Sequence, residues 1–162
     1  MLSNTIHFRE TVVPSDVKSV AEIVKSTKFF NHEEEIMAVE LVEDRLNNGE
    51  SSGYFFIFAE IEGRTVAYSC YGPIDGTESS FDLYWIVTHD DFRGKGIGKK
   101  LLAETEKAIA KAGGHGIYVE TASKPQYEPT RKFYESTNYI LEAQLKQFYA
   151  QNDDKCIYVK RV

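Results

Sequence analysis

The sequence has few of the residues that cross-link small proteins. Its 162 residues include two cysteines, Cys70 and Cys156, and neither lies in a C-x-x-C motif or a Cys/His cluster. These spacings give no support to a zinc site or a redox motif, so we expect no metal. Two cysteines are also too few for a disulfide framework, which favours a reducing cytoplasm and predicts two small core side chains.

Long hydrophobic runs and an excess of positive charge are also missing. The longest apolar run, residues 54–59, is far shorter than the ~20 residues that span a bilayer. The first ten residues lack the basic and then apolar pattern of a secretion signal. Nineteen Lys and Arg against 25 Asp and Glu give a formal charge of −6, which repels nucleic-acid phosphates. We therefore expect a cytoplasmic protein that binds neither membranes nor nucleic acids.

The composition suits one folded domain. It is 42% hydrophobic and 27% charged, as is usual for soluble globular proteins. A chain of this length buries about two-thirds of its unfolded surface, so it needs no metal or disulfide to fold. No repeat, low-complexity tract or linker divides the sequence. We predict a single domain over residues 1–162.

Hydrophobic periodicity predicts a strand and two helices in the first third of the chain. Ile6 and Phe8 alternate with polar residues, as in a short strand. Asp16 is placed to cap a helix, because apolar residues follow it at helical spacing. A second helix is predicted over residues 31–48, capped by Asn31 and ended by the glycine that follows. Its expected apolar stripe consists of Ile36, Val39, Val42 and Leu46.

The pattern then changes to a period of two. Residues 54–62 and 65–71 are rich in aromatic and β-branched side chains and are separated by a hairpin signal. A third strand is predicted over residues 81–88, and a helix over residues 96–112 follows it. A buried strand over residues 117–122 completes a strand–helix–strand unit, so the two strands beside that helix should be parallel.

The last part of the chain is predicted to hold one more helix and two strands. Pro129 suits the first turn of a helix that ends near Ser136. Residues 139–148 and 156–162 are expected to form closing strands, joined by a polar loop over residues 150–155. The sum is a mixed sheet of about six or seven strands with about four helices, in an α/β or α+β domain.

The most informative segment is the glycine-rich turn between strand 81–88 and the next helix. Residues 93–98 (RGKGIG) hold three alternating glycines, which leave little side chain in the way of a ligand. N–H groups at a helix start lack intrahelical acceptors and carry partial positive charge, which suits a phosphate or pyrophosphate. The glycine spacing fits neither the P-loop nor the dinucleotide fingerprint. A plain tight turn is the structural alternative.

This turn resembles the acyl-CoA loop of the GNAT superfamily of N-acetyltransferases. The family pattern is Arg or Gln, two residues, Gly, one residue, and then Gly or Ala. Arg93, Gly96 and Gly98 stand at the matching positions, and the strand before and the helix after are in the order that the family needs.

A second resemblance to the same family covers residues 131–139. These residues are similar to the family's late helix and the turn after it, with Asn138 in place of the usual Gly. Asn tolerates the left-handed conformation that such a turn requires. Many members carry an Asn one turn before this helix, but residues 127–129 (YEP) stand there in this chain. That coenzyme contact is therefore not expected here.

The resemblance implies the GNAT fold, a mixed and mostly antiparallel sheet with a splayed parallel strand pair, and acetyl-CoA as co-substrate. Members bind this coenzyme in the cleft where the two parallel strands separate. A bulge in the first of these strands frees backbone groups for the pantetheine and the thioester carbonyl. The residues that the resemblance assigns to the coenzyme are Ile86, Val87, Thr88, Arg93, Gly94, Lys95, Gly96, Ile97, Gly98 and Lys99.

The resemblance also implies a general acid and a general base. Tyr134 matches the family tyrosine that protonates the leaving sulfur. Asp82 stands where some protein-acetylating members carry a glutamate, and strand alternation places it on one face with Tyr84. His89, which we expect to be exposed beyond the strand end, Glu120 and water are alternative bases.

The implied function is transfer of an acetyl group from acetyl-CoA to a primary amine, by direct attack through a tetrahedral intermediate. The amine belongs to a small molecule, an amino acid or a protein, and the sequence does not say which. The alternatives are a non-catalytic module that binds or senses acyl-CoA and a structural protein in which the glycine turn is only a turn. Members of the family often form homodimers, so a homodimer stays open, but no interface is evident from the sequence.

Overall fold

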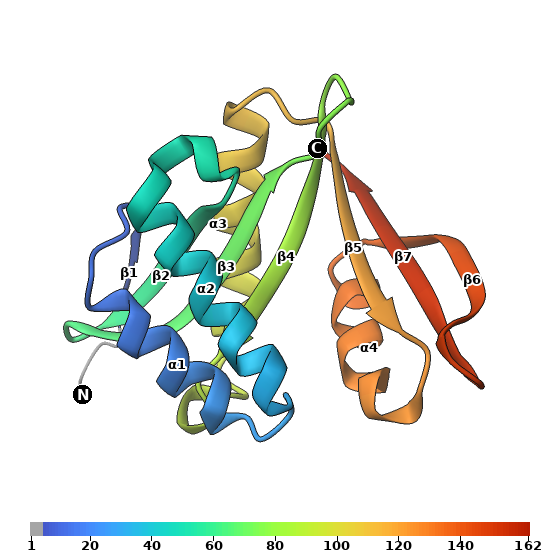
Figure 1. Ribbon diagram of the computed structural model, residues 1–162, viewed down its shortest axis with the longest axis horizontal. Coiled ribbons are helices and arrows are strands. Elements are labelled where there is room, and N and C mark those ends of the chain that lie inside the picture. The colour runs from blue at the N-terminus through green and yellow to red at the C-terminus, as the bar shows by residue number, and fades with distance from the viewer. Residues whose placement is uncertain (1–4) are drawn as a thin grey trace. The chain divides into compact units, whose positions relative to one another are not determined.

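The computed structural model describes residues 5–162, which contain seven β-strands and four α-helices (Figure 1). The strands form one sheet in the order β1-β2-β3-β4-β5-β7-β6. The chain divides into two compact units, residues 5–72 with 85–108 and residues 73–84 with 109–162, and β4 contributes to both.

The first unit holds three helices and the first strands of the sheet. Its elements are β1 (Ile6–Arg9), α1 (Asp16–Ser26), α2 (His32–Asn48), β2 (Phe55–Ile61), β3 (Arg64–Pro73), the end of β4 (Ser80–Thr88) and most of α3 (Ile97–Lys111), with 3-10 turns at Gly49–Ser52 and Asp90–Phe92. β2 pairs antiparallel with both β1 and β3. The β2–β3 hairpin turns at Glu62 and Gly63, whose φ angles of 50° and 79° suit a two-residue hairpin turn.

The core of the first unit lies between its helices and its strands. Side chains of α1 and α2 pack on one face of the strands; the buried members are Val20, Ile23, Val24, Ala38, Val42, Phe56, Phe58, Tyr68, Cys70 and Val87. Ser69 alternates with Tyr68 and Cys70 along β3, so it faces the other side. There its buried hydroxyl lies 2.8 Å from the hydroxyl of Thr105 in α3.

The start of α1 differs from the sequence prediction. Asp16 is not the cap; the residue at that position is Ser15, which makes no capping hydrogen bond through its side chain. The carboxylate of Asp16 is buried instead and accepts hydrogen bonds from Arg9 at 2.8 and 2.9 Å and from the Val13 N–H at 2.8 Å. Local sequence could not reveal this role, because Arg9 comes from a strand.

The start of α2 agrees with the prediction, but its apolar stripe is rotated. Asn31 accepts the Glu34 N–H at 2.8 Å, and Glu34 accepts the Asn31 N–H at 3.0 Å, which makes a capping box. Ile36 is 45% exposed, whereas Ala38 and Val42 are fully buried. The prediction that Ile36 faces the core is wrong, because the helix packs through the face that carries the small Ala38.

The second unit holds one helix and the rest of the sheet. Its elements are the start of β4, β5 (Gly116–Ala122), a 3-10 turn at Pro125–Tyr127, α4 (Glu128–Ser136), β6 (Ile140–Ala150) and β7 (Asp153–Arg161). β4 and β5 are parallel, as predicted, and Asp82 of β4 lies opposite Tyr118 of β5. β5 and β6 both pair antiparallel with β7.

The prediction of a polar loop over residues 150–155 is wrong. β6 continues to Ala150 and β7 begins at Asp153, so the turn between them holds two residues. Polar residues enter the strand because neighbours satisfy them: Asp153 accepts the Lys124 N–H at 3.2 Å, and Asp154 accepts the Gln144 side-chain amide at 2.8 Å.

The predicted fold class, a mixed α/β architecture, is confirmed. The sheet is mostly antiparallel with one parallel pair, β4 and β5, and four α-helices accompany it. None of the helices within residues 5–162 combines the length and apolar character needed to cross a membrane.

The Arg9–Asp16 pair provides a test of what stabilises the first unit. Asp16→Ala removes an acceptor from the Arg9 guanidinium, whose side chain is 20% exposed, and from the Val13 N–H. We expect the free energy of unfolding in urea to fall by about 3 kcal/mol. Glu22→Ala, which removes the exposed partner of Lys18, should change it by less than about 0.5 kcal/mol. Equal losses in the two variants would contradict this role of Asp16.

Candidate functional site

The turn between β4 and α3 depends on glycine. Gly94 and Gly96 have φ angles of +75° and +78°, a region that residues with a side chain rarely adopt. A Cβ atom built at either position would meet no atom within 4 Å, so the space beside the backbone is open. Glycine is therefore needed for the backbone conformation, and it leaves room for a ligand.

The N–H groups of this turn are not used by the helix that follows. Phe92 donates to the His89 carbonyl at 2.9 Å, and Arg93 donates to the Asp90 carbonyl at 3.3 Å. Within residues 5–162, the next N–H along the chain with a backbone acceptor is that of Lys100, which donates to the Gly96 carbonyl at 3.2 Å. The N–H groups of residues 94–99 are therefore available to an anion, and the dipole of α3 adds positive charge there.

Four cationic side chains lie in or beside the same turn, and all are exposed: Arg93, Lys95, Lys99 and Lys100. Arg93 lies 3.5 Å from the Asp90 carboxylate, and the Lys95 ammonium is 5.3 Å from the centre of the Phe92 ring. Positive charge in the first turn of a helix is unfavourable with respect to the helix dipole. A bound anion would offset that cost, so the charges and the N–H groups point to the same kind of ligand.

The strand before the turn holds the other coenzyme candidates, Ile86, Val87 and Thr88. The Val87 side chain is buried in the core under α1 and α2, and the other two are half-buried. Beyond the strand, the His89 N–H donates to the Val66 carbonyl of β3 at 2.8 Å. The side chain of Val87 is thus committed to packing, so this residue has its main chain to offer a ligand.

His89 is not the exposed side chain that the sequence predicted. The side chain is 14% exposed, and Nδ1 accepts the Asp91 N–H at 3.1 Å. Its Nε2 lies 3.5 Å from the Arg64 guanidinium. Both ring nitrogens are therefore engaged by neighbours, and the side chain caps the short turn before α3.

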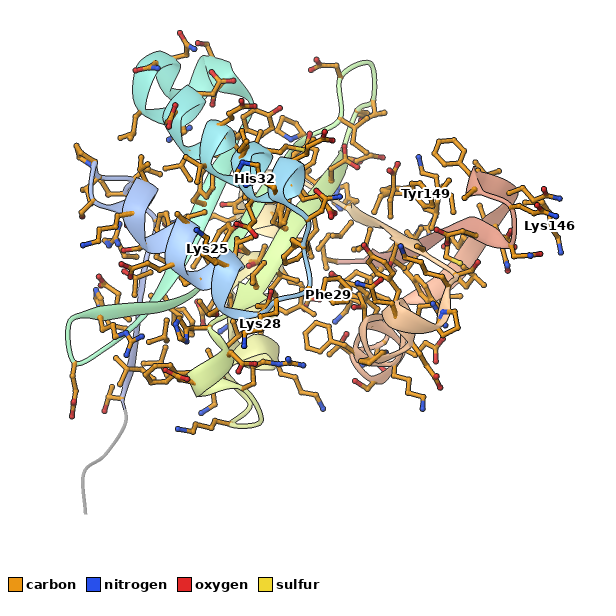
Figure 2. The ribbon with its side chains drawn as sticks, turned by 60° about the horizontal axis from the view of Figure 1, so that its bottom comes forward. Lys25, Lys28, Phe29, His32, Lys146 and Tyr149 are labelled. Atoms are coloured by element: carbon orange, nitrogen blue, oxygen red, sulfur yellow. The ribbon has the colours of Figure 1, made fainter. Side chains whose placement is uncertain are left out.

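The link between α1 and α2 adds basic and aromatic side chains to the first unit. Figure 2 shows them along the end of α1 and the beginning of α2: Lys25, Lys28, Phe29 and His32. Phe30 packs against Phe29 and against Trp85, with ring centres 5.1 and 5.0 Å apart. Phe30 and Trp85 therefore connect the link to the core, where the aromatic side chains of Tyr68 and Tyr71 are buried.

In the second unit, the carboxyl groups of Asp82 on β4 and Glu120 on β5 interact electrostatically. Burial raises the pKa of Asp82 above its ordinary value, and the negative charge of Glu120 raises this pKa further. A hydrogen bond with Tyr84 and the positive charge of Lys155 act on the pKa of Asp82 in the opposite direction. A carboxylate with a raised pKa is a stronger base, which suits the role that the sequence assigned to Asp82.

Lys155 belongs to the same group, and sequence analysis missed it. Its Nζ lies 2.9 Å from the Glu120 carboxylate and 4.3 Å from the centre of the Phe148 ring. The Lys155 side chain is 15% exposed, whereas that of Glu120 is half exposed. The polar start of β7 concealed the strand that carries Lys155, and no local pattern could have shown its partner. Glu120 therefore has Lys155 as a close partner, and the same lysine also acts on Asp82 through its charge.

Tyr134 of α4 is a buried phenol among other aromatic rings. Its ring centre lies 5.4 Å from those of Phe133 and Tyr139 and 6.3 Å from that of Tyr158. Burial raises the pKa of Tyr134 well above the ordinary value of tyrosine, so the phenol keeps its proton at neutral pH. After the helix, Asn138 has a φ of +73°, which confirms the predicted left-handed turn.

Comparisons with known proteins show what this chain is similar to. A family model described as the acetyltransferase (GNAT) family matches residues 17–139, which is more than half of the chain. An acetyltransferase of Pectobacterium atrosepticum is 33% identical over 78 residues, or 48% of this chain and 51% of that protein. The match therefore spans about half the length of this curated relative.

Solved structures extend the likeness over nearly the whole chain. A Desulfovibrio desulfuricans protein described as an acetyltransferase of the GNAT family is 41% identical, with a TM-score of 0.95 over 97% of this chain and 99% of that chain. A Salmonella typhimurium protein, described as an acetyltransferase with its cofactor acetyl-CoA, is 18% identical, with a TM-score of 0.74 over 97% and 94%. At that identity the second likeness shows the fold alone.

Removal of the Lys155 charge tests the electrostatics of Asp82. Lys155→Met removes a charge that lowers the pKa of Asp82, so we expect this pKa to rise, whereas Lys155→Arg should leave it near the wild-type value. An NMR titration of the Asp82 carboxyl carbon measures it. Lys132→Met, which removes an exposed lysine of the same unit, is the control. An unchanged pKa of Asp82 in Lys155→Met would contradict the assignment.

Lys155→Met should also change how the free energy of unfolding depends on pH. A folded-state pKa above the unfolded value means that folding favours protonated Asp82. The contribution of this group to stability is therefore present at low pH and is lost as the pH rises through the folded pKa. Urea unfolding at a series of pH values should show a deeper loss in Lys155→Met than in the wild type, and a shallower loss would contradict the assignment.

Proposed function

Because the chain belongs to the GNAT family of acetyltransferases, we propose that it transfers an acetyl group from acetyl-CoA to a primary amine. The amine belongs to a small molecule, an amino acid or a protein, and it attacks the thioester directly to give a tetrahedral intermediate. The observation that carries the proposal is the turn over residues 93–98. Its open space and available N–H groups suit the pyrophosphate of coenzyme A.

We assign coenzyme binding mainly to main-chain N–H groups of the turn and, to a smaller extent, to its cationic side chains. Gly94, Gly96 and Gly98 let the backbone approach the pyrophosphate, and the N–H groups of Lys95, Ile97 and Lys99 complete the set of donors. Arg93 and the lysine ammonium groups add long-range attraction for the phosphates. Ile86, Val87 and Thr88 contact the pantetheine and the thioester through main-chain groups, and an N–H aimed at the carbonyl oxygen stabilises the developing oxyanion.

Asp82 is the general base of the proposed reaction. It takes a proton from the attacking nitrogen, and its raised pKa strengthens it for this task. Glu120 is a weaker choice because Lys155 already pairs with it at 2.9 Å. His89 is also weaker because both of its ring nitrogens are engaged by neighbours. A water held by Asp82 would serve the same transfer over a longer distance.

Tyr134 is the general acid. The amine nitrogen forms a bond to the carbonyl carbon, the carbon–sulfur bond breaks, and the sulfur leaves with the electron pair. The Tyr134 hydroxyl gives its proton to this sulfur, which yields the free thiol. Asp82 releases the proton taken from nitrogen to solvent, and Tyr134 regains one from solvent, so both groups return to their starting states. Burial raises the pKa of Tyr134, so the phenol is protonated when the amine attacks and gives up its proton only as negative charge develops on the sulfur.

A positively charged acceptor suits the charge of this chain. The net charge of −6 favours a cation over a nucleic acid, and Asp82 and Glu120 add local negative charge. Tyr84, which interacts with Asp82, is 41% exposed and offers a ring face to an ammonium group. These features support an amine that arrives protonated and loses its proton to Asp82.

We also assign the protein to the cytoplasm. Cys70 and Cys156 are both free thiols, and both are buried. Reducing compartments keep thiols in this state, whereas oxidising compartments favour disulfides. Fractionation of cells that produce the protein tests the location, and recovery in an oxidising compartment would contradict it.

If Tyr134 is the general acid, removal of its hydroxyl group should slow the reaction. Tyr134→Phe should lower kcat by about 100-fold or more, because the sulfur then leaves without its proton donor. Release of coenzyme A thiol from acetyl-CoA over a panel of amines measures the rate. Tyr139→Phe removes a hydroxyl from the neighbouring ring, 5.4 Å away between centres, and should leave kcat close to wild type. Similar losses in both variants would count against a special role of Tyr134.

The coenzyme assignment predicts the effect of one methyl group. Gly96→Ala should raise the Kd for coenzyme A about tenfold or more in calorimetry, since the side chain strains a positive φ and fills space beside the donors. Gly76→Ala is the matched control, with a φ of +81° and equally open space outside the turn. Unchanged affinity in Gly96→Ala would contradict the site. Tight binding without turnover of any amine would support the non-catalytic acyl-CoA module instead.

A further inference from the structure

The first unit contains a pocket that the proposed reaction does not use. Its volume is about 540 Å³, which is within the usual range of small-molecule sites. Side chains of β1, α1, the β2–β3 hairpin and the residue after β4 line it, where the hairpin turn lies beside the beginning of α1 (Figure 1). The residues assigned above to the coenzyme and to proton transfer are not among those that line it.

Two hydrogen-bond donors face each other in this pocket. Nδ1 of His89 accepts the Asp91 N–H at 3.1 Å, so the neutral ring carries its proton on Nε2. This Nε2 lies 3.5 Å from Nη2 of Arg64, and a guanidinium nitrogen can only donate. The two groups are therefore in close approach without a hydrogen bond between them. An oxygen of a bound anion that accepts from both would satisfy both donors.

Arg64 also differs from Arg9, the other arginine of the pocket, in how its charge is balanced. The Arg9 guanidinium lies 2.8 and 3.4 Å from two carboxylates. The Arg64 side chain contacts His89 and the ring of Phe92, whose centre is 5.1 Å from the guanidinium carbon, and it forms no ion pair within residues 5–162. A guanidinium without a carboxylate partner is well suited to bind an oxyanion through parallel N–H groups.

Hydroxyl groups extend the polar lining along α1. Ser15 and Ser19 are one helical turn apart, and Glu22 follows three residues later, so all three lie on the face of α1 that borders the pocket. Ser15 stands at the cap position of α1, but its side chain makes no capping hydrogen bond. Its hydroxyl can therefore bond to a ligand without weakening the start of the helix.

The charges of the lining residues favour a ligand that carries both signs. Two arginines and two glutamates line the pocket, so its formal charge is zero when His89 is neutral. A simple anion would be attracted by Arg64 but repelled by Glu22 and Glu60, and a phosphate dianion would be repelled more strongly. Glu60 is already paired with an arginine at 3.4 Å. The partner of Glu22 is the exposed Lys18 at 3.9 Å, a pair that contributes little, so Glu22 can accept a cationic group.

We propose that this pocket, which we call the Arg64 site, binds a small zwitterion with a carboxylate at one end and an ammonium group at the other. The carboxylate accepts from the Arg64 guanidinium and from Nε2–H of His89, and the ammonium group pairs with Glu22. The inference goes beyond the proposed function and does not depend on it, because it concerns binding at residues outside the coenzyme turn.

An NMR titration of the full chain without coenzyme tests the site. The probes are zwitterions of increasing length: glycine, 4-aminobutyrate and 6-aminohexanoate. At least one should bind and shift the signals of His89. It should bind about tenfold or more tightly than the carboxylate or the amine that copies one of its ends, such as butyrate and butylamine for 4-aminobutyrate. Absence of binding overturns the proposal. Equal affinity for a simple carboxylate or for inorganic phosphate overturns the need for both charges.

Two variants test the ends of the ligand separately. Arg64→Met should raise the Kd of the bound zwitterion about tenfold or more, whereas Arg161→Met, an exposed arginine of the second unit, should not. Glu22→Gln should weaken the zwitterion without weakening butyrate, and Glu33→Gln on α2 is its control. Glu22 is exposed, so this variant tests the site even if Arg64→Met fails to fold. Equal effects of a variant and its control overturn the assignment.

The tautomer of His89 provides a test that needs no ligand. Long-range proton–nitrogen NMR spectra at alkaline pH, where histidine is neutral, distinguish the protonated ring nitrogen from the other one. We expect the proton on Nε2 and the lone pair on Nδ1, which accepts the Asp91 N–H. A proton on Nδ1 would make Nε2 an acceptor for Arg64, and it would overturn the pair of donors on which the site rests.

Discussion

The functional argument depends on one constraint, the availability of backbone N–H groups between β4 and α3. A helix cannot satisfy the donors of its own first turn, and here two left-handed glycines lead into the helix through a segment, residues 94–99, whose N–H groups have no backbone acceptor within residues 5–162. The same constraint explains why the turn is basic although a helix start disfavours cations. Both features make sense together if a multiply charged anion occupies the turn.

The second unit shows how environment divides tasks among similar groups. Asp82 and Glu120 are both carboxylates, but Glu120 has Lys155 as a close partner, whereas Asp82 is more buried and hydrogen-bonds with Tyr84. Tyr134 lies among rings that exclude water, which keeps its proton in place. Pairs of titratable groups whose pKa values are pushed apart are a common basis of acid and base chemistry. Here burial raises the pKa of both Asp82 and Tyr134 above their ordinary values.

Sequence patterns predicted the features that depend on neighbours along the chain. Periodicity predicted the order of elements and the parallel pair, and the turn chemistry of Asn138 was predicted because left-handed helix ends have few solutions. Two of the wrong predictions share a different cause. Asp16 was assigned to a cap and Lys155 to a loop because their partners, Arg9 and Glu120, come from other elements. An ion pair between residues of different elements has no pattern in local sequence spacing. These ion pairs could therefore be found only in the structure.

The hydroxyl pair between β3 and α3 has a consequence for ligand geometry. Thr105 donates its single proton to the Leu101 carbonyl at 2.8 Å, so Ser69 must donate to Thr105, and the pair has one allowed arrangement. A directional bond of this kind fixes the rotation of α3 about its own axis, which apolar packing alone leaves loosely defined. Because Thr105 is about two turns from the start of the helix, the aim of the N–H groups beside Gly96 is set by a contact well inside the protein. Replacement of either hydroxyl by a methyl group would then let α3 rotate about its axis. The N–H groups beside Gly96 would change direction although the substitution does not contact them.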